Sequence, residues 1–262
     1  MNRVQTELVE VPSVRERVSP EEWQTRVDLA ACYRLVFLHG WHHLTLNHIS
    51  ARIPGEEEHF LLNPFGLMYN EVKASNLVKI DLEGNILDDT PYSIQQAGYT
   101  IHSAVHAARK DVQCVIHTHT HAGMGVSALN CGVLPLNQGA LRFYNRIGYH
   151  EYEGIALDLD ERERIAASLG EHKALVLRNH GLLTVGRTIS EAFVLMFHLE
   201  KVCATQLAIN ATTANSNIYS FPSPEVCERA ARQAERGGRN PGEASWPALV
   251  RMADRADPSF RE

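Results

Sequence analysis

Three histidines alternate within one short stretch of the sequence, Ile-His-Thr-His-Thr-His at 116–121. In a β-strand, residues i and i+2 point to the same face, roughly 6.5 Å apart, so His117 and His119 can turn toward one ion. Burying several imidazoles together costs desolvation free energy unless something pairs with them. The spacing predicts a metal site at His117 and His119. His121 would share that face, as a further ligand or as an ordinary hydrogen-bonded residue.

A more distant histidine, His180, lies in Arg-Asn-His-Gly at 178–181, between two apolar segments. Gly181 lets the backbone bend sharply there, which can aim the imidazole inward. Taken alone, His180 is either a ligand or a structural turn residue. His102 and His106 lie one helical turn apart and would suit a metal pair in isolation, but we interpret them as supporting or structural residues.

Hydrophobic periodicity and breaker residues predict the elements that must position these side chains. The expected helices cover residues 20–38, 93–109, 125–129, 160–168 and 225–235, with a long helix that opens at Thr188. The expected strands cover 44–53, 59–63, 77–87, 112–119, 174–178 and 182–185.

Helices mixed with short strands predict an α/β fold with αβα layers. We expect a single domain with a central, largely antiparallel β-sheet covered by helices on both faces. The 262 residues, 44% of them hydrophobic, are enough for one large core. We divide the chain into a polar lead-in at 1–18, a body at 19–214, and a C-terminal helix and arm at 215–262 that packs on the body or on a neighbouring subunit.

Composition argues against several classes of protein. A net charge of −6 without a long basic cluster argues against a nucleic-acid partner. The apolar runs are much shorter than the roughly 20 residues of a membrane span, and residues 1–17 lack the apolar stretch of a secretory signal. We therefore expect a cytoplasmic protein without a membrane segment. The five cysteines form no CxxC pair, so neither a disulfide framework nor a cysteine zinc site is indicated.

The strings DVQCVIHTHTHAGMGVSAL and LVLRNHGLLTVG resemble the two metal-ligand segments of class II aldolases and their adducin-like relatives. NHISARI, FLLNPFG and WPALVRMADRADPSF extend the resemblance to nearly the whole chain. It implies a class II aldolase-like fold at 19–214 and a divalent metal ion held by His117, His119 and His180, with an open position for water or substrate. Zinc is the expected ion, with manganese or iron as alternatives. The resemblance also implies a homo-oligomer, expected to be a tetramer, with its active site at a subunit interface.

The chain departs from the sugar-phosphate aldolases at their acid/base glutamate, whose matching position is Gly98. Glycine cannot move a proton. The hydroxyl residues that help to hold phosphate in those aldolases match Gln96, Ala97 and Phe65. Asn47 and Gly66 survive as substrate-binding candidates, and we expect a substrate without a phosphate group.

Replacement proton carriers could come from the segment 143–153, where related enzymes place a tyrosine that reaches into a neighbour's active site. Tyr149 is our candidate catalytic residue, whereas Tyr144 and Tyr152 are interpreted as core or interface aromatics. Arg178 is the candidate for a substrate carboxylate. Arg142 and Arg146 could do the same, and all three arginines could instead form structural ion pairs.

The expected function is a divalent-metal-dependent lyase that cleaves a C–C bond, by retro-aldol reaction or decarboxylation. Its small-molecule substrate would be a hydroxy-carbonyl compound or a hydroxy acid. Three neutral histidines leave a divalent ion its full charge, which suits a substrate bound through two oxygens. Two alternatives stay open: a non-haem iron(II) oxygenase on the same three histidines, and a non-catalytic binding module like the head domain of adducin.

Overall fold

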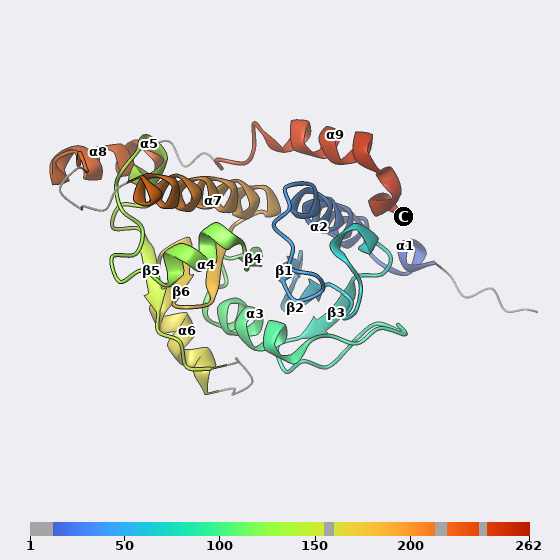
Figure 1. Ribbon diagram of the computed structural model, residues 1–262. Helices are drawn as coiled ribbons and strands as arrows, with labels where there is room; N and C mark the ends of the chain where they lie inside the picture. Colours follow the sequence, from blue (N-terminus) through green and yellow to red (C-terminus); the bar gives the residue numbers. More distant parts are fainter. Residues whose placement is uncertain (1–12, 155–159, 213–218, 236–239) are drawn as a thin grey trace, which may run out of the picture.

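A computed structural model describes residues 13–154, 160–212, 219–235 and 240–262 (Figure 1). Seven strands form one sheet in the order β3-β2-β1-β4-β7-β6-β5. Neighbouring strands are antiparallel except β5 and β6, which are parallel. The strands are β1 His48–Ile53, β2 Glu56–Leu62, β3 Val78–Asp81, β4 Cys114–Thr118, β5 Ile147–His150, β6 Ala174–Leu177 and β7 Gly181–Gly186.

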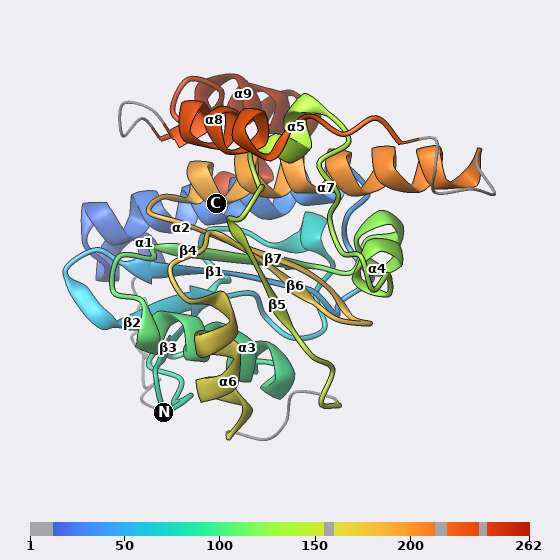
Figure 2. The same cartoon turned by 90° about the vertical axis from the view of Figure 1, so that its left-hand side faces the viewer.

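Helices cover both faces of this sheet (Figure 2). Helices α2 (Pro20–Leu38) and α7 (Ile189–Ala211) lie on one face, and α3 (Gln96–Ala108) and α6 (Glu161–Leu169) lie on the other. The expected αβα single domain with a largely antiparallel sheet is thereby confirmed. The remaining elements are α1 Val14–Arg17, η1 Tyr69–Glu71, α4 His121–Ser127, α5 Gln138–Leu141, α8 Pro224–Glu235, α9 Trp246–Ala256 and η4 Pro258–Arg261.

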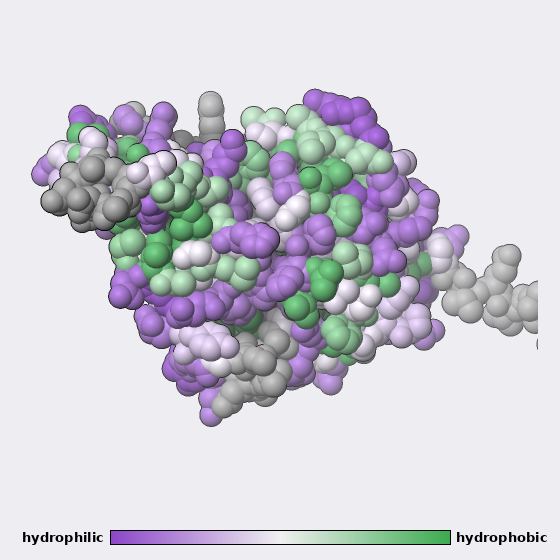
Figure 3. All heavy atoms as spheres, in the orientation of Figure 1, coloured by the Kyte–Doolittle hydropathy of each residue, from purple (hydrophilic) through white to green (hydrophobic). Residues whose placement is uncertain are grey.

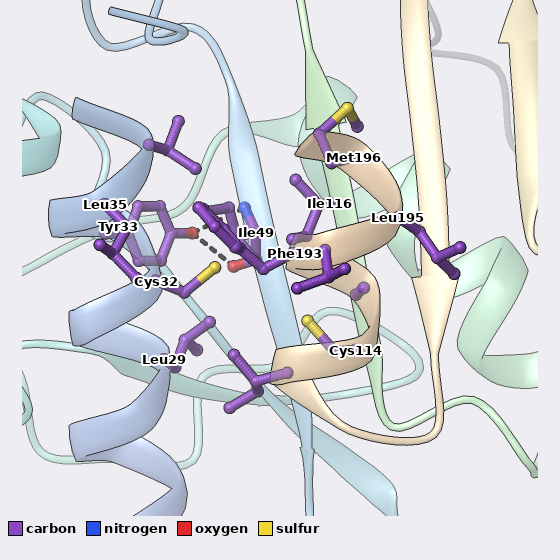
Figure 4. Close-up of a cluster of buried hydrophobic side chains, with 14 of the residues drawn as sticks. Leu29, Cys32, Tyr33, Leu35, Ile49, Cys114, Ile116, Phe193, Leu195 and Met196 are labelled. Atoms are coloured by element: carbon purple, nitrogen blue, oxygen red, sulfur yellow. Dashed lines mark hydrogen bonds between the residues drawn. The ribbon is translucent and has the colours of Figure 1, made fainter. Parts of the chain in front are cut away.

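Helix α2 has the start and the end that its sequence predicts. The Ser19 side chain accepts a hydrogen bond from Glu22 N at 3.0 Å, and Pro20 occupies the first helical position. The helix ends before Gly40, whose φ of 68° suits glycine. Its buried Tyr33 joins it to β1, because Tyr33 Oη accepts from Ile49 N at 2.7 Å and donates to Ile49 O (Figure 4).

Several predicted boundaries were wrong around the histidine segment. Strand β4 ends at Thr118, so His119 lies just outside the strand, and β1 begins at His48 instead of residue 44. The hydrogen-bonded pairing of β4 with β1 ends at His117, because its partner His48 is the first residue of β1. Thr120 then accepts from Gly123 N at 3.0 Å and caps α4, so His121 is an exposed helical residue and does not share a strand face with His117.

Strand β5 was not predicted, since its four residues, Ile-Gly-Tyr-His, show neither an apolar run nor a clear alternation. Its parallel pairing with β6 supplies the ordering that the local sequence lacks.

Helix α7 is long and apolar enough to cross a membrane by length and composition alone, which the scan for uninterrupted apolar runs missed. In the fold it behaves as a core helix: 56% of its most apolar window is buried, and it packs on β4, β7 and α4. Apolarity of this kind is typical of a helix buried on more than one side.

The C-terminal residues are held against α2 and the η1 region. Phe260 is fully buried, and its carbonyl accepts from Ala74 N at 2.9 Å. Arg34 on α2 forms an ion pair with Asp257. The division of the chain at residues 18/19 and 214/215 stays a prediction; residues 1–12 and 213–218 lie outside the described part.

We expect Phe260→Ala to lower the free energy of unfolding by about 3–5 kcal/mol, because it empties a fully buried aromatic site. Urea unfolding followed by circular dichroism measures the change. Phe221→Ala removes the same ring from a 48% exposed position and should have little effect. An equal loss of unfolding free energy in the two variants would contradict the packing of the C-terminal residues against the body of the protein.

Candidate metal centre

The three predicted histidine ligands converge at the end of β4. Ligand nitrogens of His117, His119 and His180 all lie within 4.8 Å of one another, and the ring centroids are 4.6–4.8 Å apart. His117 comes from β4, His119 from the residue after it, and His180 from the turn between β6 and β7. Asn179 makes that turn with a φ of 56°, a conformation that asparagine tolerates. Among the described residues, this is the one His/Cys/Asp/Glu group arranged to hold a metal.

The imidazoles of the trio are in the protonation state that a metal requires. Burial lowers the pKa of all three: well below 6.5 for His117, to about 3 for His119, and below the usual value for His180. Each is therefore neutral near pH 7 and has a lone pair. His117 Nδ1 donates to Leu182 O at 2.9 Å, which leaves Nε2 as its ligand atom. This donor set fits a divalent transition metal such as zinc.

A carboxylate from α7 holds the strand end from the opposite face of the sheet. Thr118 Oγ1 donates to Glu200 at 3.1 Å, and Thr120 Oγ1 donates to the same carboxylate at 2.6 Å. Burial raises the pKa of Glu200. These bonds fix the residues on either side of His119. The sequence analysis missed Glu200; its only local signal is a charge inside an apolar helix.

His43 also lies beside the trio. Its Nδ1 is 3.4 Å from His119 Nδ1, and the side chain is otherwise exposed. By contacting Nδ1 of His119, His43 can orient the His119 ring. The other ring nitrogen of His119, Nε2, then faces His117 Nε2 at 2.8 Å. The tandem His42-His43 could have suggested such a role.

His48 fills the space next to Gly98, the position that matches the aldolase glutamate. A Cβ added at Gly98 would lie 2.6 Å from three atoms of the His48 ring, closer than real Cβ contacts come. His48 Nε2 is 2.6 Å from Gln95 Oε1, whereas its buried Nδ1 has no partner among the described residues. Burial lowers the pKa of His48 to about 4. The space beside Gly98 therefore holds a neutral imidazole supplied by β1, which the sequence analysis did not identify. The match of Gly98 to the aldolase glutamate stays a prediction.

His102 and His106 do not join the trio. Ser50 Oγ lies 2.6 Å from His102 Nδ1 and 2.8 Å from His106 Nε2, so the three form a buried polar cluster between β1 and α3. This arrangement agrees with the supporting role expected of the two histidines.

The predicted substrate-binding residues are Asn47, which has an unpartnered amide among the described residues, and Gly66, which has open space beside its backbone. Asn47 is fully buried, and neither its Oδ1 nor its Nδ2 has a partner among the described residues. Buried polar atoms are rarely left unpaired, so this amide is available to a ligand or a water. Gly66 has a φ of 92° with open space at the Cβ position, so a ligand could approach its backbone closely. Neighbouring Phe65 is 47% exposed.

Tyr149 lies on the sheet face opposite His117 within the same chain. Tyr149 packs on the core formed with α2 and α7, whereas Val115, two residues before His117, belongs to the core under α3 and α6. Tyr149 Oη accepts from Val133 N at 3.0 Å. Its predicted role concerns a neighbouring subunit's site and stays a prediction.

The three candidate arginines have different surroundings. Arg178 stacks on Tyr149 at 4.5 Å and donates to Leu129 O at 2.6 Å. Arg146 forms ion pairs with Glu228 and Glu235. No side-chain partner is found for Arg142 in the described part of the chain. Arg178 Nε also lies 3.8 Å from Glu151 Oε1. Arg146 and Arg178 thus both form the ion pairs given as the alternative, and carboxylate binding by Arg178 stays a prediction.

The sequence profile of the family described as Class II Aldolase and Adducin N-terminal domain matches residues 27–207. The chain belongs to this family. The match spans both ligand segments, so the resemblance drawn from those segments is confirmed.

The chain is similar both to aldolase-type proteins of known structure and to adducins. The crystal structure of an aldolase II superfamily protein from Pseudomonas syringae is 49% identical, with a TM-score of 0.90, and covers 96% of this chain and 100% of that one. L-fuculose 1-phosphate aldolase from Glaciozyma antarctica PI12 is 27% identical, with a TM-score of 0.81, covering 92% and 93%. Alpha-adducin from Rattus norvegicus is 42% identical over 87% of this chain but only 33% of the adducin.

We expect Gly98→Ala to lower the free energy of unfolding by about 1–3 kcal/mol through overpacking against His48. Alanine at a helical glycine normally adds up to about 1 kcal/mol of stability, so the sign itself is informative. In a His48→Ala background, Gly98→Ala should become neutral or stabilising, as measured by a double-mutant cycle in urea. An identical cost in both backgrounds would rule out the contact.

The buried histidines should make the metal-free protein acid-sensitive. Burial lowers the pKa of His106 to about 3, below its unfolded value near 6.5. The unfolded state therefore binds more protons between these pH values, and stability falls as pH drops through that window. Between pH 7.5 and 4.5, His106 alone accounts for a loss of about 2–3 kcal/mol.

Urea unfolding with a chelator, across the same pH range, measures this loss. His106→Gln should flatten the pH dependence by about that amount, and the exposed His121→Gln should leave it unchanged. A wild-type stability that does not vary over this range would contradict the neutral buried state.

Proposed function

We propose that this protein is a divalent-metal-dependent lyase of the class II aldolase type that cleaves a C–C bond in a small hydroxy-carbonyl compound or hydroxy acid. The observation that carries this proposal is the convergence of three neutral imidazoles, with His117 oriented by Leu182 O. The fold shared with L-fuculose 1-phosphate aldolase supports it. A bound ion, with zinc as the first expectation, would supply a Lewis acid that accepts electron density during the cleavage.

A substrate without phosphate fits the residues around this centre. Gln96 and Phe65 stand where hydroxyl side chains were expected from the family pattern, and Phe65 presents an exposed aromatic ring. The unpaired Asn47 amide and the accessible Gly66 backbone would hold the polar atoms of the substrate, and Arg178 is proposed for a carboxylate. Tyr149 stays our candidate for proton transfer from a neighbouring subunit.

His48 supplies a polar group at the glutamate position. Its Nδ1 is a hydrogen-bonding atom without a partner on the described chain, beside the residue that would carry the carboxylate in an aldolase. We assign it a hydrogen bond to a substrate hydroxyl or to a water that bridges to the substrate. Gly98 is then the residue that makes room for this imidazole.

Exposed apolar side chains support the proposed homo-oligomer. Leu44, Leu46, Phe65 and Tyr152 are between 39% and 64% exposed. Figure 3 also shows apolar residues gathered on the left of the molecule, below α8 and α5. Apolar surface of this kind is typically covered by a partner, and a tetramer stays our expectation for this family member.

A non-catalytic binding module is the second candidate, favoured by the 42% identity to alpha-adducin. It requires no metal. The iron(II) oxygenase alternative uses the same trio, and the identity of the bound ion separates it from the lyase.

Metal content tests the proposal first. Protein purified without a metal-binding tag should contain about one divalent ion per chain by mass spectrometry. His117→Ala and His180→Ala should lose it because each removes one of three ligands, while the control His121→Ala should retain it. Zinc or manganese favours the lyase, and iron with oxygen uptake favours the oxygenase.

Activity provides the second measurement. Cleavage of unphosphorylated hydroxy-carbonyl compounds and hydroxy acids should stop with a chelator and return with the ion, and phosphorylated analogues should be poorer substrates. Wild-type protein that is empty and cannot be loaded would overturn the lyase and leave the binding module as the better proposal.

A further inference from the structure

A cavity of about 400 Å³ lies at the far end of the β6–β7 hairpin from His180. Lys173 and Ala174, where β6 begins, line it together with Arg187, just after β7, whereas His180 lies in the turn between these strands. A strand rises about 3.3 Å per residue, so β7 separates the two ends by roughly 17 Å. The cavity is separate from the candidate metal centre, and its volume is in the range of small-molecule sites.

The charged side chains around this cavity leave an excess of positive charge. The acids are Glu171, Glu191 and Glu235, and the cations are Arg142, Arg146, Lys173 and Arg187. Two of the cations are already paired: Lys173 Nζ is 2.5 Å from Glu191, and Arg146 Nε is 2.7 Å from Glu235. Within the described residues no salt bridge is found for Arg142 or Arg187, although Arg187 lies near enough to Asp111 to help lower the pKa of that carboxyl.

Arg142 gives this excess a definite position. Its side chain is half-buried, and burial lowers its pKa with no acid to oppose the effect. A cation that is partly removed from water without a counter-charge is unfavourable. The apolar side chains of Phe143 and Leu195 line the same cavity as Arg142.

We propose that this cavity binds a small organic anion, whose carboxylate or phosphate group pairs with Arg142 and Arg187 while its apolar part lies against Phe143 and Leu195. The planar fork of a guanidinium matches two oxygens of either group. The site is independent of the metal and of the proposed lyase reaction, and it is suited to an effector or an accessory ligand.

Isothermal titration with phenyl phosphate and with phenylacetate tests this site, and inorganic phosphate shows what the charge alone contributes. Wild-type protein should bind one or both aromatic probes saturably at one site per chain. Arg142→Gln should weaken binding at least about tenfold, with a smaller loss for Arg142→Lys, which keeps the charge but not the fork. Preference between the two aromatic probes distinguishes a phosphate from a carboxylate ligand.

Two control variants separate binding in this cavity from general charge attraction and from binding at the metal centre. Arg251→Gln removes the same charge from an exposed position on α9 and should leave the affinity unchanged; an equal loss there would overturn the proposal in favour of non-specific charge attraction. His180→Ala disables the metal centre and should also leave it unchanged. Binding that disappears in His180→Ala would place the anion at the metal and overturn the proposal. Absence of saturable binding of both aromatic probes would overturn it too, provided that thermal unfolding shows the protein to be folded.

Discussion

The pairing of β4 between β1 and β7 is the constraint on which the candidate metal centre depends. It places His117 opposite His48 on one side and opposite Leu183 on the other, and the carbonyl of adjacent Leu182 accepts the Nδ1 proton of His117. The ladder ends at Thr118, where Thr118 and Thr120 bond to Glu200 on α7. His119 is thus held between two fixed residues, although it lies outside the strand.

Burial of neutral imidazoles is the second physical theme. His48, His102, His106 and His117 all lie between the sheet and α3, and burial lowers the pKa of each. A neutral histidine can be buried at moderate cost when its nitrogens find partners. Ser50 Oγ provides one such partner each for His102 and His106. This packing explains why glycine is suited to position 98: the space beside it is taken by a ring from β1.

Family membership indicates the fold and the place for a metal ion, whereas the side chains of this chain indicate which substrate could bind. The shared fold provides the sheet, the turn at His180 and a place for an ion. The predicted match of residues 65 and 98 to the phosphate and acid/base positions of the aldolases stays a prediction, so the substrate is argued from this chain's own side chains. The cavity at Arg142 shows the same division, because its unpaired guanidinium depends on how α5, α7 and α8 come together and not on the metal-site motif.

The sequence by itself predicted the layered fold and paired His117 with His119, because the capping residues of helices such as α2 and the alternating histidines leave a local signal. His180 joined this pair only through the family resemblance. It could not fix where β4 ends, since that depends on where its partner β1 begins. It did not detect β5, which is ordered by pairing with β6. Nor could it relate His48 to Gly98, 50 positions away in the sequence. It also could not show that Arg146 and Arg178 meet acids whereas Arg142 meets none among the described residues. Tertiary structure decided these points, because each depends on contacts between segments that are distant in the chain.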